Sequence, residues 1–311
     1  MRPNFFVVGT VKAGTTSLYQ YLTEHPEIYM SPLKEPHFFS TDIDPSRFRT
    51  QYRKMLPLDI EQYLASDLKG IVNAAFIRRE EQYLRLFKNV KNEKAIGESS
   101  TSYLISKEAA QNIYNYDPKA KIIILLRNPV GRAYSHYLMN YKSGSVTGLF
   151  KTELELDLKA EPKGWGITRL YVDHGFYYEQ VKRYLDVFGP DQVKIILTEQ
   201  LGAEVQQTIR EVYQFLNVKD NFIFDNYERH NVAMIPRSYF ARLILDRANI
   251  ISMFVKFVPV RFKRFVYNSL FTKTQFPAFE EETKKFLKEL YREDILKTQA
   301  LTKIDLSAWL K

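Results

Sequence analysis

The sequence contains no cysteine, which excludes disulfide bonds and thiolate metal sites and favours a reducing compartment. Histidine is also scarce, and its five copies show no metal-ligand spacing, so we predict that the protein has no metal site. Long apolar runs are missing too, because the longest uncharged apolar stretch late in the chain, 248–255, is far too short to span a bilayer. These absences argue against a disulfide scaffold, a metalloenzyme and a transmembrane protein.

The overall composition is that of a globular protein. The 311 residues are 45% hydrophobic and 14% aromatic, which is ample for a sizeable core. We find no internal repeat, low-complexity tract or Pro/Ser-rich linker, and we therefore predict a single domain over residues 1–311. The first apolar run begins about four residues after Met1, so we expect no signal peptide, no N-terminal anchor and a cytoplasmic location. The formal charge is +9, and the basic residues concentrated between positions 237 and 275 predict a surface that attracts anions.

A glycine-framed loop near the N-terminus is the first functional signal. The apolar run 5–8 leads into Gly9, then into small residues around Lys12, and then into apolar positions at helical spacing. In a strand, loop and helix of this kind, backbone N–H groups and the positive end of the helix converge on one spot, which suits a phosphate. The residues expected to bind it are Lys12, Ala13, Gly14, Thr15, Thr16 and Ser17. The same pattern also occurs without a ligand, so the loop alone leaves a structural role open.

Two other classes of function compete at this point. A P-loop NTPase carries its lysine directly after the second glycine of the loop, where this chain has Thr15. A magnesium-ATP site is therefore disfavoured, although a P-loop nucleotide kinase or NTPase remains the alternative function. A catalytically silent module that binds anions or nucleic acid is supported only by the net charge.

A second stretch, 121–137, favours a bound phosphate ligand over a purely structural role of the loop. Its apolar run without alternation, 122–126, is typical of a strand that is covered on both faces of a parallel sheet. Arg127 follows the strand at once, Pro129 suits the first turn of a helix, and Ser135 comes two turns later. Arginine can bind a phosphate bidentately and stays charged, while Ser135 offers a further hydroxyl.

The remaining pattern predicts strands that alternate with helices. We expect further strands at 94–98 and 193–197, short helices within 46–87, and longer helices at 106–116, 176–188, 205–216 and 283–297. The predicted fold is therefore α/β: a single P-loop-like domain with a central parallel sheet flanked by helices, a core over about 4–216 and a mostly helical C-terminal part over about 237–311. Glu98 ends a strand at the edge where such sheets bind ligands, so it either orients the substrate that accepts the transferred group or orients Lys12, or it caps the Ser/Thr cluster 99–102. We place a wall of the pocket for this acceptor substrate between Tyr141 and Thr168.

Five stretches together resemble the PAPS-dependent sulfotransferase family, in particular bacterial carbohydrate-type enzymes and heparan sulfate sulfotransferase domains. They are FFVVGTVKAGTTSL, LKEPHFF, GESSTSYL, LLRNPVGRAYSHY and GFYYEQVKRYLDVF, and the resemblance covers residue 4 to about 216. It implies that 3'-phosphoadenosine 5'-phosphosulfate (PAPS) is the donor and adenosine 3',5'-bisphosphate (PAP) the product, with no metal. The loop 12–17 would bind the 5'-phosphosulfate of the donor, and Arg127 and Ser135 would bind its 3'-phosphate. The acceptor would be a hydroxyl or an amine, and we predict that it belongs to a carbohydrate.

The resemblance also suggests catalytic roles. Lys12 is the candidate for relieving charge on the bridging oxygen, and Glu35 matches the glutamate before the His-Phe-Phe element that serves as base, so we also place it against the acceptor. Glu35 could instead be a surface carboxylate paired with Lys34. His37 is the second candidate for the base, unless it is a packed ring. The chain departs from the family at Thr101, where relatives often have proline.

The part of the chain beyond position 216 matches the family less clearly. The basic loop that completes the 3'-phosphate site has no clear counterpart, and Arg237 and Lys273 are the candidates for that role. The basic and aromatic segment 242–267 could bind nucleic acid or a membrane surface, but its pattern also fits helices packed on a domain, which we favour. We therefore predict no nucleic-acid partner. The sequence does not indicate the oligomeric state.

Overall fold

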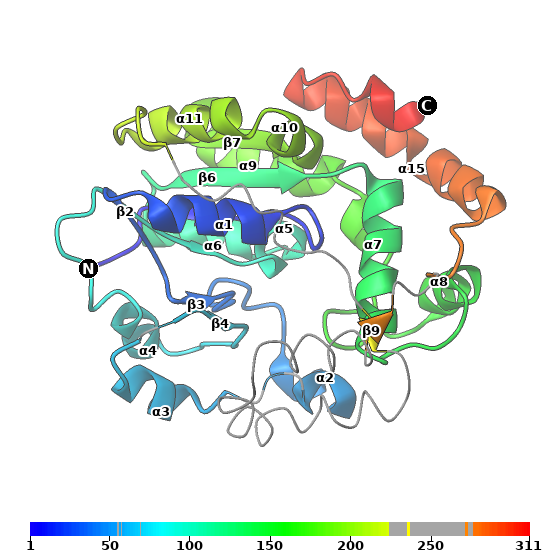
Figure 1. Ribbon diagram of the computed structural model, residues 1–311, viewed down its shortest axis with the longest axis horizontal. Coiled ribbons are helices and arrows are strands. Elements are labelled where there is room, and N and C mark those ends of the chain that lie inside the picture. The colour runs from blue at the N-terminus through cyan, green and yellow to red at the C-terminus, as the bar shows by residue number, and fades with distance from the viewer. Residues whose placement is uncertain (55, 57, 69, 224–234, 237–270, 273–275) are drawn as a thin grey trace.

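The molecule is built around a five-stranded parallel sheet with the strand order β2-β5-β1-β6-β7 (Figure 1). The structure is a computed structural model that describes residues 1–54, 56, 58–68, 70–223, 235–236, 271–272 and 276–311. The strands of the main sheet are β1 (Phe5–Val7), β2 (Ile28–Met30), β5 (Ala95–Ser99), β6 (Lys121–Leu126) and β7 (Val193–Leu197). Two small two-stranded sheets pair β3 (Leu33–Lys34) with β4 (Val72–Asn73) and β8 (Ile235–Pro236) with β9 (Phe271–Thr272).

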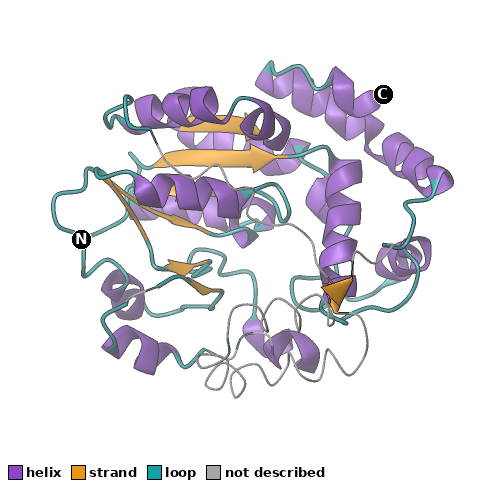
Figure 2. Cartoon of the chain, viewed as in Figure 1, coloured by secondary structure: helices purple, strands orange, loops and turns teal. Residues whose placement is uncertain are grey.

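Helices cover both faces of the main sheet, which gives three layers (Figure 2). One face packs against α1 (Thr15–Glu24), α10 (Thr198–Ala203) and α11 (Val205–Leu216). The other face packs against α5 (Ser102–Ile105), α6 (Ala109–Tyr116), α7 (Pro129–Lys142), α9 (Tyr178–Phe188) and α15 (Glu281–Thr302). Further elements are α8 (Phe150–Lys159) and four short 3-10 helices: Pro45–Arg47, Asp173–Gly175, Pro190–Gln192 and Ser307–Leu310.

The alternation of side chains along β1 explains why its sequence is apolar without a break. Phe5 and Val7 are fully buried in the cluster with α1 and α11, while Phe6 and Val8 are fully buried in the cluster on the opposite face. Both faces of a parallel strand covered by helices must be apolar, because neither meets water. The strand is therefore fixed in the middle of the core, and the loop that follows it emerges at the carboxyl edge of the sheet.

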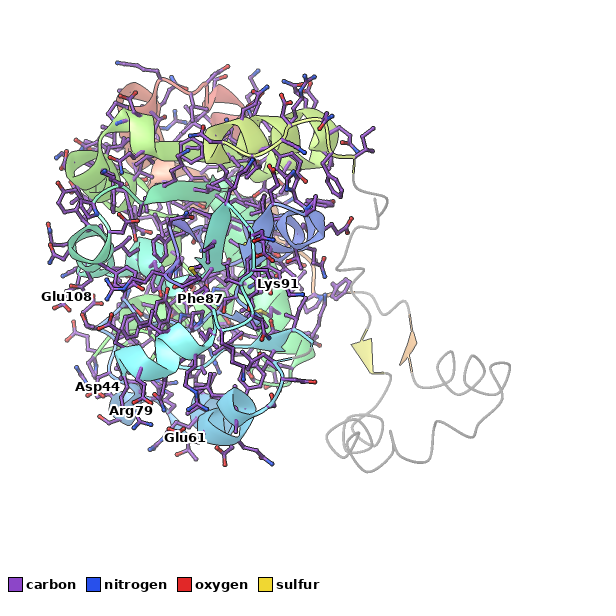
Figure 3. All side chains as sticks on the ribbon, turned by 90° about the vertical axis from the view of Figure 1, so that its left-hand side faces the viewer. Asp44, Glu61, Arg79, Phe87, Lys91 and Glu108 are labelled. Atoms are coloured by element: carbon purple, nitrogen blue, oxygen red, sulfur yellow. The ribbon has the colours of Figure 1, made fainter. Side chains whose placement is uncertain are left out.

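The chain between β2 and β5 forms a separate small layer below the main sheet in Figure 1. It contains β3, β4, α2 (Thr50–Lys54), α3 (Ile60–Ala65) and α4 (Glu80–Arg85). Figure 3 shows this side of the molecule, where Glu61 of α3 and Arg79 before α4 lie next to each other and form an ion pair. This layer matters for function because it carries the segment after β3 to the carboxyl edge of the sheet.

The predicted fold class is confirmed. The predicted strand at 193–197 has the observed bounds, and the other predicted strands and the long helices of the described residues are present within a few residues. The edge strand β2 and the pair β3 and β4 were not predicted. The end of the predicted helical C-terminal part is present as α15, whereas the segment 242–267 lies outside the described residues. None of the described helices has the combination of length and apolar character that is needed to cross a bilayer.

Candidate active site

The glycine-framed loop follows β1 and begins beside the neighbouring strand β6. The Thr10 N–H donates to the Leu125 carbonyl at 3.1 Å, which seats the start of the loop on β6. A Cβ atom at Gly9 would lie 2.7 Å from both the Leu125 Cβ and the Thr15 Cγ2, so only glycine fits at this position. Lys12 and Gly14 have φ values of 72° and 90°, and α1 begins directly after Gly14 with no side-chain cap. The first N–H groups of α1 are therefore without a capping side chain and can bind an anion.

Arg127 and Thr198 hold the carbonyl groups of this loop. The Arg127 Nη1 donates to the Lys12 carbonyl at 3.1 Å, and the Thr198 Oγ1 lies 2.5 Å from the Ala13 carbonyl and 2.9 Å from the Leu126 carbonyl. Lys12 and Arg127 thus lie at the same edge of the sheet. Thr198 was not predicted, although it follows a buried strand directly, as Arg127 does, and the same reasoning applied to β7 would have found it.

Positive charge is concentrated around Lys12. Burial of its ammonium group, followed by the charges of Lys142, Arg127 and Lys34, lowers the pKa of Lys12 below its ordinary value. Glu35 is near enough to act in the opposite direction. A site with several cations and one carboxylate favours the binding of an anionic ligand.

Glu35 lies directly after β3 in a left-handed conformation, with φ 68°. Its Oε1 accepts from the Lys34 Nζ at 2.6 Å, and its Oε2 accepts from the Thr101 Oγ1 at 2.9 Å. Burial alone would raise the pKa of Glu35, but the Lys34 charge and these hydrogen bonds outweigh it and hold the pKa below its ordinary value. The side chain is 20% exposed, so an ionised carboxylate at this edge is accessible.

His37 is a packed ring at the same edge. Its side chain is 1% exposed, its Nδ1 lies 2.7 Å from the Ser102 Oγ, and its Nε2 lies 3.5 Å from the Glu35 Oε2. Its ring stacks on Phe76, with the centroids 4.4 Å apart. Burial lowers the pKa of His37 to about 4, so the ring is neutral at pH 7. This environment favours the packed ring over a base that meets the acceptor.

Glu98 is buried beneath these residues and has no exposed surface. Its Oε1 accepts from the hydroxyls of Tyr83 at 3.0 Å and Tyr103 at 2.5 Å, and its Oε2 accepts from the Ser100 Oγ at 2.8 Å. Burial raises the pKa of Glu98 to about 7, although these three hydroxyls oppose the shift. The position favours a structural role over direct contact with an acceptor.

The other predicted residues are distributed around this edge. Ser135 is half-buried in α7, the helix that begins just after Arg127 and runs away from the carboxyl end of β6 (Figure 1). Trp165 brings the segment 141–168 to the site: its ring centroid is 5.6 Å from that of His37, and its Nε1 donates to the Tyr52 hydroxyl at 2.7 Å. Arg237 and Lys273 lie outside the described residues.

The fold and the loop together define an α/β protein of the P-loop-like class, with a candidate anion site at the carboxyl edge of its parallel sheet. The sulfotransferase domain family matches residues 2–297, and the chain belongs to this family. The resemblance seen in the sequence is therefore confirmed.

Individual relatives agree with this assignment. The chain is 33% identical to a sulfotransferase from Alicyclobacillus acidocaldarius whose crystal structure is known, with a TM-score of 0.72 and 100% of both chains covered. It is 28% identical to carbohydrate sulfotransferase 15 of Rattus norvegicus over 70% of this chain and 44% of that protein. It is also 28% identical to the bifunctional heparan sulfate N-deacetylase/N-sulfotransferase 4 of Mus musculus, over 71% of this chain and 23% of that protein. The chain thus spans less than half the length of these two curated relatives.

Proposed function

We propose that the protein transfers a sulfuryl group from PAPS to a hydroxyl or amine of a carbohydrate. The observation that supports this most directly is the hydrogen bond from Arg127 to the Lys12 carbonyl, because it shows that the two residues proposed to bind phosphate lie at one edge of the sheet. A donor with a 5'-phosphosulfate and a separate 3'-phosphate needs two such sites. The ionised Glu35 beside them is suited to receive a proton.

Each end of the donor has its own group of residues in this proposal. The N–H groups of the loop 12–17 and the hydroxyls of Thr15, Thr16 and Ser17 would bind the 5'-phosphosulfate. Among the described residues, Arg127 donates from its Nη1 to the loop, and its other N–H groups would bind the 3'-phosphate, to which Ser135 would add a hydroxyl. Loop geometry and phosphate binding are then coupled through one guanidinium.

The proposed reaction is a single displacement at sulfur. The acceptor oxygen or nitrogen forms a bond to sulfur while the bond from sulfur to the bridging oxygen of the donor breaks, and the electron pair stays on the 5'-phosphate of PAP. Lys12 would stabilise the charge that develops on this oxygen, and Glu35 would take the proton from the acceptor.

The acceptor class rests on the names of the curated relatives. Trp165 lies beside His37 and would form part of the acceptor wall. Incubation of a panel of carbohydrates, phenols and steroids with ³⁵S-labelled PAPS should label carbohydrates, and labelling of the other classes alone would contradict this choice.

Thermal unfolding with nucleotides tests the donor. PAP at 100 times its Kd should stabilise the protein by about 2.7 kcal/mol, whereas ATP or GTP with magnesium should have little effect. Stabilisation by the magnesium nucleotides only would support a P-loop nucleotide kinase instead.

We further expect Lys12→Ala to reduce turnover far more than PAP affinity, and Arg127→Ala to reduce PAP affinity more than turnover at saturating donor.

A further inference from the structure

The segment around Glu35 adopts a backbone conformation that its own sequence does not favour. Glu35 and His37 are both non-glycine residues in the left-handed region, with φ values of 68° and 51°. Residues with side chains rarely adopt this conformation, and it persists only where the surrounding structure holds it in place. The contacts that hold these two residues therefore also determine where the Glu35 carboxylate lies.

Four consecutive residues after Glu98 provide such contacts, one each. The Ser99 carbonyl accepts from the Glu35 N–H at 2.9 Å, and the Ser100 Oγ accepts from the His37 N–H at 3.1 Å. The Thr101 hydroxyl donates to the Glu35 Oε2 at 2.9 Å, and the Ser102 Oγ lies 2.7 Å from the His37 Nδ1. We call residues 99–102 the serine turn. It fixes both the backbone and the side chains of the Glu35 segment.

Glu98 determines the direction of the hydrogen bonds at Ser100. A hydroxyl has one proton, and when Glu98 is ionised the Ser100 Oγ donates it to the Glu98 Oε2 at 2.8 Å. Only oxygen lone pairs then remain at Ser100, and these are what the His37 N–H requires. The other Glu98 oxygen is held by the hydroxyls of Tyr83 and Tyr103, so the carboxylate cannot turn away.

We infer that Ser100, aligned by Glu98, is a positioning residue that acts through Glu35: it holds the carboxylate where it can receive the acceptor proton. This inference rests on the proposed function. A displacement of about 1 Å at a reacting group can cost about 100-fold in rate, so loss of the Ser100 hydroxyl should be visible in turnover. The donor site should not be affected, because Ser100 contacts neither the loop 12–17 nor Arg127 in the hydrogen bonds of the described residues.

The test begins with Ser100→Ala, and Thr101→Val serves as a second variant in case the first does not fold. Each should lower kcat by about tenfold or more, while the KM for PAPS and the affinity for PAP stay within about twofold. Ser106→Ala is the matched control. Ser106 is as buried as Ser100, but its hydroxyl contacts Asp42 and the start of α6, so the control should change stability and leave kcat unchanged.

A double-mutant cycle with Glu35→Gln separates positioning from a general structural effect. If Ser100 acts through Glu35, Ser100→Ala should lower kcat much less in the Glu35→Gln background than in the native protein. Full additivity of the two losses would overturn the inference, as would a native kcat for Ser100→Ala. Failure of the proposed function would be distinguishable from failure of this inference. Native protein that binds no PAP would contradict PAPS as the donor, and native turnover in Glu35→Gln would contradict Glu35 as the base.

Discussion

At the scale of single residues, the Lys34 and Glu35 pair shows how the structure sets the protonation state of the proposed base. The Lys34 side chain is 4% exposed and its ammonium lies 2.6 Å from the Glu35 Oε1. Without the lysine, burial would favour the protonated acid, which cannot take a proton. In the sequence, the neighbouring Lys34 suggests a simple surface ion pair as the alternative role of Glu35, whereas in the structure the charge of Lys34 keeps the carboxylate ionised at neutral pH.

Replacement of Lys34 with methionine should move the acidic limb of the kcat profile to higher pH. Glu35 must be ionised to act as base, so activity falls as the pH decreases through its pKa, and loss of the Lys34 charge raises that pKa. An opposite charge at this distance typically shifts a carboxyl pKa by about 1–3 units. The measurement is kcat against pH at saturating donor.

Lys94→Met is a suitable control for this variant, because Lys94 forms a similar 2.7 Å pair with Glu27 at the opposite end of β5. We expect its profile to coincide with that of the native protein. An unchanged acidic limb in Lys34→Met would show that Lys34 does not set the titration of the base, or that the base is a residue other than Glu35.

At the scale of elements, Thr198 links three segments that are far apart in the sequence. Its hydroxyl lies at the start of α10 and approaches the carbonyls at Ala13 in the donor loop and at Leu126 at the end of β6. The same loop is held by Arg127. Buried carbonyl groups without a donor are costly, so the loop geometry should depend on this hydroxyl.

Thr198→Val should therefore lower PAP affinity by about tenfold, which corresponds to about 1.4 kcal/mol, close to the net value of one hydrogen bond. Thr198→Ser keeps the hydroxyl and should bind PAP as the native protein does. Isothermal titration with PAP measures both. Native affinity in Thr198→Val would mean that Arg127 and the backbone hold the loop without it.

The sequence predicts those elements whose pattern lies within a single segment of the chain. The strands β1 and β6 are visible as apolar runs, and the residues that follow them, Gly9 and Arg127, are predicted for that reason. The edge strand β2 has only three residues, too few for a clear period. The order of the strands and the left-handed conformation at Glu35 depend on contacts between distant segments, such as the one with Ser99, and no local pattern encodes them.

At the scale of the whole molecule, the titration of the buried Glu98 makes the folding stability depend on pH. It faces Tyr83 of α4, Tyr103 of α5 and Ser100, and the charge of Glu35 also reaches it. Its pKa rises from the ordinary 4.5 to about 7 in the folded protein, so the folded state binds this proton more tightly than the unfolded chain does. The stability from this group is full below about pH 4.5 and is lost as the pH rises to about 7.

Glu98→Gln removes this titration while keeping the size of the side chain. Between pH 5 and pH 8, the free energy of unfolding of the native protein should fall relative to that of the variant by up to about 3 kcal/mol, from about 1.4 kcal/mol per pKa unit. Urea unfolding of both proteins across this range measures the difference, and other titrating groups cancel because both proteins share them. For the control Glu80→Gln, which changes an exposed carboxylate, the plot of the free energy of unfolding against pH should run parallel to that of the native protein. Parallel curves for native protein and Glu98→Gln would mean that Glu98 titrates near its ordinary pKa and that burial does not raise it in the folded protein.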